Sequence, residues 1–365
     1  MSSTWGQHLI ISLFGESHGP AVGVVIDGLP PGFILDESEI ARQMSRRAPG
    51  RTPWSTQRME SDEIRILSGL YRQRTSGAPL CALIENKDVR SEDYDELKIK
   101  PRPGHADLTA QFRYHGFQDP RGSGHFSGRL TAPLVFAGAV CRQIIKPKGI
   151  RIGAHIAEIA GIRDEAFDPL CEDMQKLCRP GERDFPVLNE AAGQDMISEI
   201  LKAAQAGDSV GGVVEAMICG LPAGLGNPMF GGIESRLSSL LFGVPGIKGV
   251  AFGAGFEAAR MTGSEHNDVP FFKDGVISYR TNHSGGIIGG ISNGMPIVFQ
   301  TVVRPPASIA KPQQTVNLKN GCEETLVVKG RHDPCIVPRV VPVIEAAAAV
   351  FTLDLLLDEG VPAYA

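Results

Sequence analysis

The sequence lacks an apolar run long enough to cross a bilayer as a helix, which takes about 20 residues. The apolar stretch 131–141 is too short, and the run 346–357 contains Asp354. The N-terminal stretch MSSTWGQHLIISLF also lacks the basic start and the cleavage site of a secretory signal. We therefore expect no membrane association and a cytoplasmic location.

Cysteine and histidine are not arranged as metal ligands. The seven cysteines are scattered without a CxxC pair, and the nine histidines form no HxH or HxxxH pair. An odd number of scattered cysteines also argues against a disulfide framework and fits reduced thiols in a cytosol. We therefore expect neither a metal site nor disulfides.

The excess of basic residues that general nucleic-acid binding requires is missing as well. The formal net charge is −5, although local clusters of arginine are present. With 365 residues, of which 42% are hydrophobic and 21% charged, the chain has the composition of a soluble globular protein with a sizeable core. Its 43 glycines and 26 prolines indicate a fold rich in loops.

Strands and helices are predicted throughout, without a clean repeat of strand–helix–strand units. Strands are expected at 20–28, 79–85, 210–219 and 296–302. Asp36 and Glu39 predict the start of a helix that Pro49-Gly50 ends, and further helices are expected at 128–144, 187–205, 232–242 and 343–357. The polar stretch 160–186 is interpreted as a surface excursion. We therefore expect a single α/β or α+β domain over residues 1–365, with long functional loops.

The stretch GESHG, residues 15–19, places an acid, a hydroxyl and an imidazole side by side between two glycines. Three consecutive side chains cannot all point one way on a strand, whereas a loop aims each of them independently. Gly15 and Gly19 supply permissive backbone. The stretch therefore predicts a loop that holds a ligand.

Two further segments concentrate positive charge. Residues 45–58 carry arginines around a Pro-Gly turn, and residues 102–129 combine arginines with three histidines and a glycine-rich run. A solvated helix end explains a lone arginine pair, and a loop histidine bonded to backbone explains His105 equally well. Together, however, the segments favour a site for a multiply charged anion, because arginine binds phosphate and carboxylate bidentately. The run GSGHFSGR before a helix can also offer amide groups to a phosphate.

Two C-terminal segments complete the candidates. RPPASIAKP occupies residues 304–312, and KGRHDPC at 329–335 places Arg331, His332 and Asp333 together. An aspartate beside an imidazole can orient it or relay its proton, but Asp-Pro also opens ordinary turns. FGAGFEAA at 252–259 contains GxGxxA without the strand–helix–strand context of a dinucleotide site, so an NAD(P)-dependent dehydrogenase is the weaker interpretation.

In their order, these motifs resemble the chorismate synthase family. GESHG, RRxPG…TQR, RPGHAD, RGSGxxSxR, NHSGGIIGGIS and KGRHDPC follow one another with the family's spacing from about residue 6 to residue 357. The stretches 66–88 and 220–226 extend the match between the motifs. Each motif is weak alone, whereas the ordered set is specific.

The resemblance implies a lyase that converts 5-enolpyruvylshikimate 3-phosphate to chorismate and phosphate, the last step of the shikimate pathway. Phosphate leaves C3 and a proton leaves C6 in a formal 1,4-elimination. The family needs reduced FMN, although the reaction has no net redox change, and forms a homotetramer with a βαβ-sandwich core. No long insertion is present, so an external flavin reductase is expected rather than the NADPH-dependent reduction of bifunctional members.

The same resemblance implies roles for individual residues. His18 resembles the histidine that donates a proton to the leaving phosphate, and His105 resembles the histidine that protonates the flavin. Asp333 resembles the acidic residue implicated in removing the C6 proton. The residues implied to bind the substrate are Ser17, Arg46, Arg47, Arg129 and Arg331. Those implied to bind FMN are Arg47, His125, Phe126, Ser127, Pro245, Gly246, Gly289, Arg304, Pro305, Pro306, Ala307, Ser308, Lys311 and Arg331.

Four positions depart from the commoner family pattern. The family frequently has Arg-Ser at the position of His125-Phe126 and Glu at that of Leu130. It frequently has Arg at the position of Pro53 and Asn-Ala at that of Pro245-Gly246. Ring stacking by Phe126 predicts altered FMN contacts rather than lost ones, and Arg51 is the candidate replacement for the arginine missing at Pro53. The alternative function is a catalytically silent FMN- or anion-binding protein, which predicts loss of His18, His105 or Asp333; all three are present.

Overall fold

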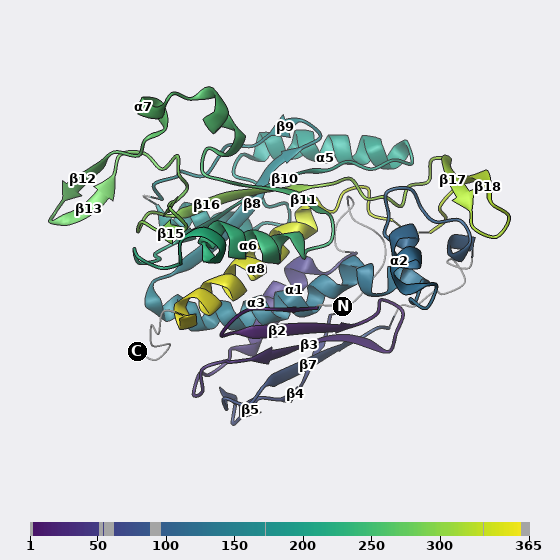
Figure 1. Cartoon of the computed structure of the whole chain (residues 1–365), viewed down its shortest axis with the longest axis horizontal. Coiled ribbons are helices and arrows are strands. Elements are labelled where there is room, and N and C mark those ends of the chain that lie inside the picture. Colours follow the sequence, from purple (N-terminus) through teal and green to yellow (C-terminus); the bar gives the residue numbers. More distant parts are fainter. Residues whose placement is uncertain are drawn as a thin grey trace.

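The computed structural model describes residues 3–50, 54, 62–87, 96–171, 173–330 and 332–358. Two five-stranded sheets lie on either side of a layer of helices (Figure 1). Helices α1 (Glu37–Arg47), α3 (Thr131–Ile145), α6 (Ile233–Phe242) and α8 (Val337–Asp358) form that layer, and α5 (Glu190–Gln205) covers the outer side of the second sheet.

Both large sheets are antiparallel at every neighbouring pair. The first has the order β1 (Thr4–Trp5), β2 (Ile10–Gly15), β3 (Ala21–Asp27), β7 (Leu80–Glu85), β4 (Ile64–Ser68). The second has the order β11 (Ile247–Phe252), β16 (Ile297–Val303), β10 (Gly212–Cys219), β8 (Arg151–Ile159), β9 (Ile162–Arg163). Of the two expected classes, the α+β form is therefore the one that the chain adopts.

Smaller elements extend from these layers. The remaining strands pair as hairpins: β5 (Leu70–Tyr71) with β6 (Arg74–Thr75), β12 (Pro270–Lys273) with β13 (Val276–Tyr279), β14 (Ile287–Ile288) with β15 (Ile291–Ser292), and β17 (Gln313–Asn317) with β18 (Cys322–Leu326). The short helices are α2 (Asp107–Tyr114), α4 (Met174–Cys178) and α7 (Gly263–His266). The β12–β13 hairpin and α7 project from one end of the molecule, and β17–β18 lies at the other (Figure 1).

The core runs through the helix layer and both sheets, because the middle helices are covered on both sides. Helices α3 and α8 approach closely at Gly138, where a Cβ atom would lie 2.3 Å from Cα of Ala346. The expectation that no apolar run is long enough to cross a bilayer is wrong for α8, which is long and apolar enough by length and composition. However, 94% of its most apolar window is buried within the fold. A helix that is apolar on all sides and buried in this way is typical of a protein core.

Most of the expected elements are confirmed. The four predicted strands correspond to β3, β7, β10 and β16, and the helices expected at 187–205 and 232–242 correspond to α5 and α6. Helix α1 begins after Asp36, whose carboxylate accepts the N–H groups of Ser38 at 2.9 Å and Glu39 at 3.3 Å. It ends before Pro49, as expected.

Three expectations differ from the structure. Helix α8 begins at Val337 rather than at 343 and continues through Pro342, because the surrounding apolar layers outweigh the local preference of proline. Helix α3 begins at Thr131, after a 3₁₀ turn over Gly128–Leu130. The interpretation of 160–186 as a surface excursion is wrong in part, since Phe167 and Leu177 are buried in a small apolar cluster of their own.

Glu345 on α8 is a buried carboxylate that should make the fold sensitive to acid. Its Oε2 lies 2.5 Å from Nη1 of Arg46 and 2.8 Å from Nη1 of Arg142. Burial alone would raise the pKa of Glu345, but the two guanidinium groups outweigh burial and lower it to about 2, below the ordinary value of 4.5. Because the folded pKa is depressed, this stabilisation is complete above pH 4.5 and is lost as the pH falls toward 2.

We expect Glu345→Gln to lower the free energy of unfolding at pH 7 by about 3–5 kcal/mol, since it leaves two buried cations without their partner. The variant should also lose part of the wild-type decline in stability between pH 4.5 and pH 2. Urea unfolding at a series of pH values measures both effects. Equal stability of the two proteins at pH 7 would contradict the account.

Candidate active site

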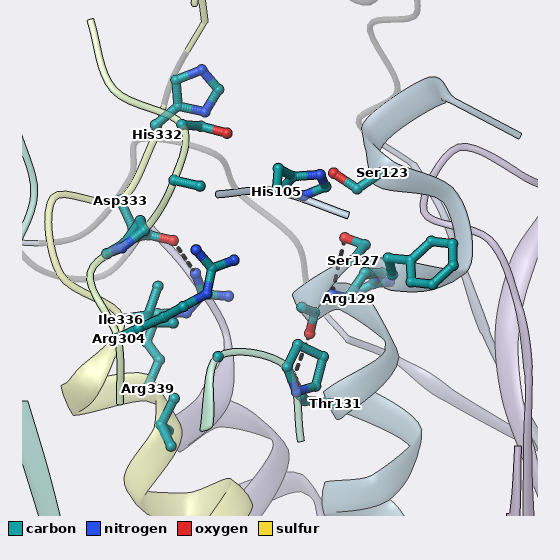
Figure 2. A pocket seen from close by; sticks show the side chains of 18 of the residues that line it. His105, Ser123, Ser127, Arg129, Thr131, Arg304, His332, Asp333, Ile336 and Arg339 are labelled. Carbon is teal, nitrogen blue, oxygen red and sulfur yellow. Dashed lines mark hydrogen bonds and ion pairs between the residues drawn. The ribbon is translucent and has the colours of Figure 1, made fainter. Parts of the chain in front are cut away.

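One cavity of about 280 Å³ lies where several loops meet the start of α8. It is lined by the end of α1, the segment 102–105, the stretch 122–131, the turn 245–246, the loop 304–308 and residues 332–343. In Figure 2, Asp333 and His332 lie on one side of this cavity, and Ser127 and Arg129 lie on the other. Segments that the sequence analysis singled out separately therefore meet in one place.

The lining carries more positive than negative charge. Its five arginines are Arg47, Arg102, Arg129, Arg304 and Arg339. Among the described residues, three carboxylates pair with them: Asp62 with Arg47 and Arg129, Asp107 with Arg102, and Asp333 with Arg339. Among the described residues the arginines of the lining thus outnumber the carboxylates that pair with them, which suits an anionic ligand.

Arg47 and Arg129 share one buried carboxylate. Oδ2 of Asp62 accepts hydrogen bonds from Nε and Nη2 of Arg47 at 2.9 and 2.6 Å, and Oδ1 accepts from Nη1 of Arg129. Burial lowers the pKa of Arg47 to about 10, against the opposing effect of Asp62. Arg47 therefore remains charged at neutral pH, and Asp62 holds both guanidinium groups at fixed positions in the cavity wall.

His105 is held by side chains rather than by backbone. Its Nδ1 lies 2.7 Å from Oδ1 of Asp107, and Arg102 holds the same carboxylate through Nε and Nη2 at 2.8 Å each. Burial lowers the pKa of His105, against the raising effect of Asp107, and so favours the neutral ring. We assign the Nδ1–H as the donor to Asp107, which is closer than Nη2 of Arg102 at 3.1 Å, and this assignment leaves Nε2 as the proton-accepting nitrogen.

The GESHG stretch forms the loop of the β2–β3 hairpin, as the sequence predicted. Gly15 has φ +96°, and a Cβ atom there would lie 2.2 Å from the carbonyl oxygen of Ala21. Ser17 and His18 are buried behind the cavity wall at Gly122. A Cβ atom on Gly122 would lie 2.3 Å from Cδ2 of His18 and 2.8 Å from Oγ of Ser17.

Ser17 is an unusual buried hydroxyl. Its side chain is fully buried, and its Oγ has no hydrogen-bond partner within the part of the chain that the structure describes. Such groups are rare in folded proteins and are often satisfied by a ligand or water. The hydroxyl is therefore in the right place to complete an anion site at Gly122.

We expect Gly122→Ala to lower kcat by about 100-fold, because it should displace His18, the proton donor that the resemblance implies, and a shift of about 1 Å has effects of this size. The new methyl group meets His18, and the φ of +56° at this position strains any residue but glycine. Gly263→Ala is the matched control, since nothing lies within 4 Å of its Cβ position. A Gly122→Ala enzyme with wild-type kcat would show that Gly122 does not fix His18.

Asp333 reaches the cavity from the loop before α8. Its Oδ2 accepts a hydrogen bond from Nη1 of Arg339 at 2.6 Å, and Nε of Arg339 donates to the carbonyl oxygen of Arg47 at 3.1 Å. His332, beside it, donates from Nε2 to the carbonyl oxygen of Lys329 at 3.1 Å. Arg339 thus ties the aspartate of the RHD motif to the end of α1.

The residues expected to bind FMN divide into two groups. Those that line the cavity are Arg47, Phe126, Ser127, Pro245, Gly246, Arg304, Pro305, Pro306, Ala307 and Ser308. His125 instead lines an adjoining cavity of about 810 Å³, which shares His105, Phe126, Thr131, Pro245, Gly246 and Arg304 with the first. The ring of His125 is bonded to the carbonyl oxygen of Gly15 at 2.8 Å and to Oγ of Ser3 at 2.7 Å.

Several other predicted residues lie away from the lining. Arg46 forms an ion pair with Glu345. Lys311 lies on the surface, with its Nζ 2.7 Å from Oδ2 of Asp208. Gly289 lies in the exposed turn between β14 and β15. Arg331, Arg51 and Pro53 fall outside the described residues.

Sequence reasoning missed Arg102, Asp107, Arg339 and Asp62. The first two stand within the RPGHAD motif, and Arg339 lies in the first turn of α8, shortly after the RHD motif, so closer reading of both motifs could have found them. Asp62 gave no signal, because its partners are 15 and 67 residues away in sequence.

Two antiparallel sheets around buried helices, with an arginine-rich cavity that also contains His105 and Asp333, indicate an enzyme that acts on an anionic substrate. The family model described as chorismate synthase matches residues 9–357. The chain is 45% identical to the chorismate synthase of Aeropyrum pernix over 96% of this chain and 92% of the relative. It is 43% identical to that of Dehalococcoides mccartyi, over 99% and 98%.

A solved structure agrees with these matches. The crystal structure of a chorismate synthase superposes with a TM-score of 0.74 at 26% identity, covering 97% of this chain and 93% of the other. The chain therefore belongs to the chorismate synthase family, and the resemblance drawn from the motifs is confirmed. It is a carbon–oxygen lyase of aromatic amino-acid biosynthesis that forms chorismate.

Proposed function

We propose that the arginine-lined cavity is the place where 5-enolpyruvylshikimate 3-phosphate and reduced FMN bind together. The observation that carries the proposal is the convergence of five arginines, His105 and Asp333 on one cavity from segments far apart in sequence. A substrate with two carboxylates and a phosphate needs such an excess of positive charge. Ser17, Arg47 and Arg129 are the described residues that we assign to it, with Arg331 from the motif.

The walls of the cavity also suit a flavin. Phe126, Pro245 and Pro305 offer flat apolar surfaces, and Arg304 supplies a cation beside them. The backbone at Gly246, with φ +97°, brings its carbonyl within 2.9 Å of the Arg304 amide, so the turn and the loop form one wall. FMN would be held by these residues together with Ser127 and Ser308, and reduced FMN supplies electron density to the substrate as phosphate departs.

Arg46, His125, Gly289 and Lys311 have a weaker place in this proposal. Arg46 and Lys311 are engaged in ion pairs away from the lining, and His125 supports the GESHG loop through Gly15. His125 borders the adjoining cavity and is assigned to a more distant part of the flavin site, whereas Gly289 is assigned from its motif alone.

Proton transfers are assigned to three residues. His18, behind Gly122, gives a proton to the phosphate oxygen as the C3–O bond breaks. Asp333 removes the proton from C6. The electron pair of that C–H bond then forms a double bond between C6 and C1, the existing C1–C2 double bond moves to C2–C3, and the C3–O electron pair leaves with phosphate. His105, with Nε2 as acceptor and Asp107 fixing its tautomer, exchanges a proton with the ligands of the cavity.

The wider setting belongs to the same proposal. We place the enzyme in a cytoplasm, where an external flavin reductase would supply reduced FMN. Large apolar side chains stand exposed at Phe230, Phe256 and Phe272, with 89%, 83% and 77% of their surface accessible. Exposed groups of this kind are the surface that assembly into a homotetramer would cover.

Anaerobic phosphate release from 5-enolpyruvylshikimate 3-phosphate tests the function. We expect release with FMN and dithionite and none with oxidised FMN alone. Release with NADPH and FMN in place of dithionite would make the enzyme bifunctional and remove the need for an external reductase. A folded, flavin-binding protein that releases no phosphate in any arm would instead be a catalytically silent binding protein.

A further inference from the structure

Asp62 stands directly behind the anion site without lining it. Its side chain is fully buried, and it touches the guanidinium groups of Arg47 and Arg129, which both line the cavity. We propose that Asp62 is a positioning residue that fixes Arg47 and Arg129 as a paired binding site for one anionic oxygen group of the substrate. The inference deepens the proposed function and rests on it.

The geometry allows one carboxylate to orient two cations at once. Each oxygen of Asp62 takes a different arginine: Oδ2 accepts from Nε and Nη2 of Arg47, and Oδ1 accepts from Nη1 of Arg129. Nη1 of Arg47 then points toward Oγ1 of Thr131, 3.3 Å away, and Thr131 lines the cavity. The carboxylate therefore decides which edge of Arg47 faces the ligand.

Charge explains why this arrangement binds an anion rather than only stabilising the fold. The exposed fractions of Arg47 and Arg129 are only 1% and 5%, and two buried like charges repel each other strongly. One carboxylate, shared by both guanidinium groups, lessens that repulsion. An anionic group of the ligand would lessen it further, so the fixed pair of cations favours such a group.

The surrounding backbone supports a functional placement. Asp62 adopts φ +47°, a left-handed conformation that is unfavourable for residues other than glycine and most tolerated by Asn and Asp. Strain of this kind gathers at ligand sites, where the neighbouring structure enforces it. Arg129 is fixed further by Asn86, whose Oδ1 accepts from Nε at 3.0 Å and whose Nδ2 donates to the carbonyl oxygens of Glu16 and Gly19. Asp62, Arg129 and the GESHG loop thus form one connected assembly.

The chain contains its own control for the alternative, a purely structural ion pair. Glu345 is likewise buried and likewise pairs with two arginines, Arg46 and Arg142, but none of the three lines the cavity. Asp62→Asn and Glu345→Gln each remove the charge while keeping the shape of the side chain. Loss of stability alone reduces the amount of folded enzyme and so the apparent kcat, whereas loss of positioning raises KM.

The test compares these variants in the anaerobic phosphate-release assay with FMN and dithionite. We expect Asp62→Asn to raise KM for the substrate at least about tenfold, while Glu345→Gln leaves KM within about twofold at equal concentrations of folded protein. Asp62→Glu keeps the charge but displaces the carboxylate, and we expect it to fold and to raise KM several-fold. An unchanged KM in whichever Asp62 variant folds, or an equal rise in Glu345→Gln, would overturn the proposal.

A second measurement separates this proposal from the proposed function. Calorimetric titration with inorganic phosphate needs no catalysis and is done on the wild-type protein and the variants. We expect the affinity for phosphate to fall at least about tenfold in Asp62→Asn. If that variant does not fold, we expect a several-fold fall in Asp62→Glu. Suppose that the wild-type protein releases no phosphate from substrate, but the Asp62 variant binds inorganic phosphate more weakly than the wild type does. The proposed function then fails and the anion site stands. If the folded Asp62 variant binds phosphate as the wild type does, the positioning role fails whatever the activity.

Discussion

Replacement of His105 by alanine is expected to lower kcat by about 10²–10⁴-fold, the usual effect of removing an acid–base group. The ring of His105 lines the cavity. Its Nδ1 is bonded to Asp107, and its Nε2 is left to exchange a proton. FMN affinity should change far less, because the flat walls at Phe126 and Pro245 remain. Steady-state phosphate release and a titration of flavin fluorescence measure the two quantities.

His115→Ala is the matched control for that variant. His115 lies at the exposed end of α2, ten residues further on and outside the cavity lining. We expect its kcat to equal that of the wild type. A His105→Ala enzyme within about threefold of wild-type kcat would remove His105 from the chemistry.

Asp333→Asn is expected to lower kcat by about 10²–10³-fold, because an amide of the same shape cannot take up a proton. The amide oxygen can still accept the hydrogen bond from Arg339, which is 2.6 Å away in the wild type, so the loop should keep its place. If removal of the C6 proton becomes rate-limiting, deuterium at C6 should slow the variant more than the wild type. Single-turnover rates with both substrates give this isotope effect.

Asp208→Asn provides the comparison for Asp333→Asn. Asp208 also pairs with a cation, Lys311, but on the surface, and it does not line the cavity. Its loss should leave both kcat and the isotope effect unchanged. A nearly wild-type kcat for Asp333→Asn, with no added isotope effect, would assign proton removal to another group.

Local rules predicted much of the fold. The cap at Asp36, the stop at Pro49 and the strand-forming runs of β3, β7, β10 and β16 all depend on neighbours in sequence. The loop character of GESHG followed from three polar residues between glycines, and the structure confirms it. The start of α8 could not be predicted in this way, because burial between two sheets overrides the preference of Pro342.

The site was predictable as a set of motifs but not as a network. Arg46 and Arg47 are adjacent in sequence, yet one turns to Glu345 and the other to Asp62, and only α1 packing against α3 and α8 decides which faces the cavity. Similarly, His125 belongs to the glycine-rich motif but is bonded to Ser3 and Gly15. Pairings across such separations depend on the tertiary fold, and one sequence does not reveal them.

The most direct test of the account is a crystal structure of the protein with oxidised FMN and 5-enolpyruvylshikimate 3-phosphate. The account predicts both ligands in the arginine-lined cavity, with anionic groups of the substrate against Arg47 and Arg129, and His105 and Asp333 in contact with the bound ligands. Ligands bound at another surface, with this cavity left to solvent, would contradict it.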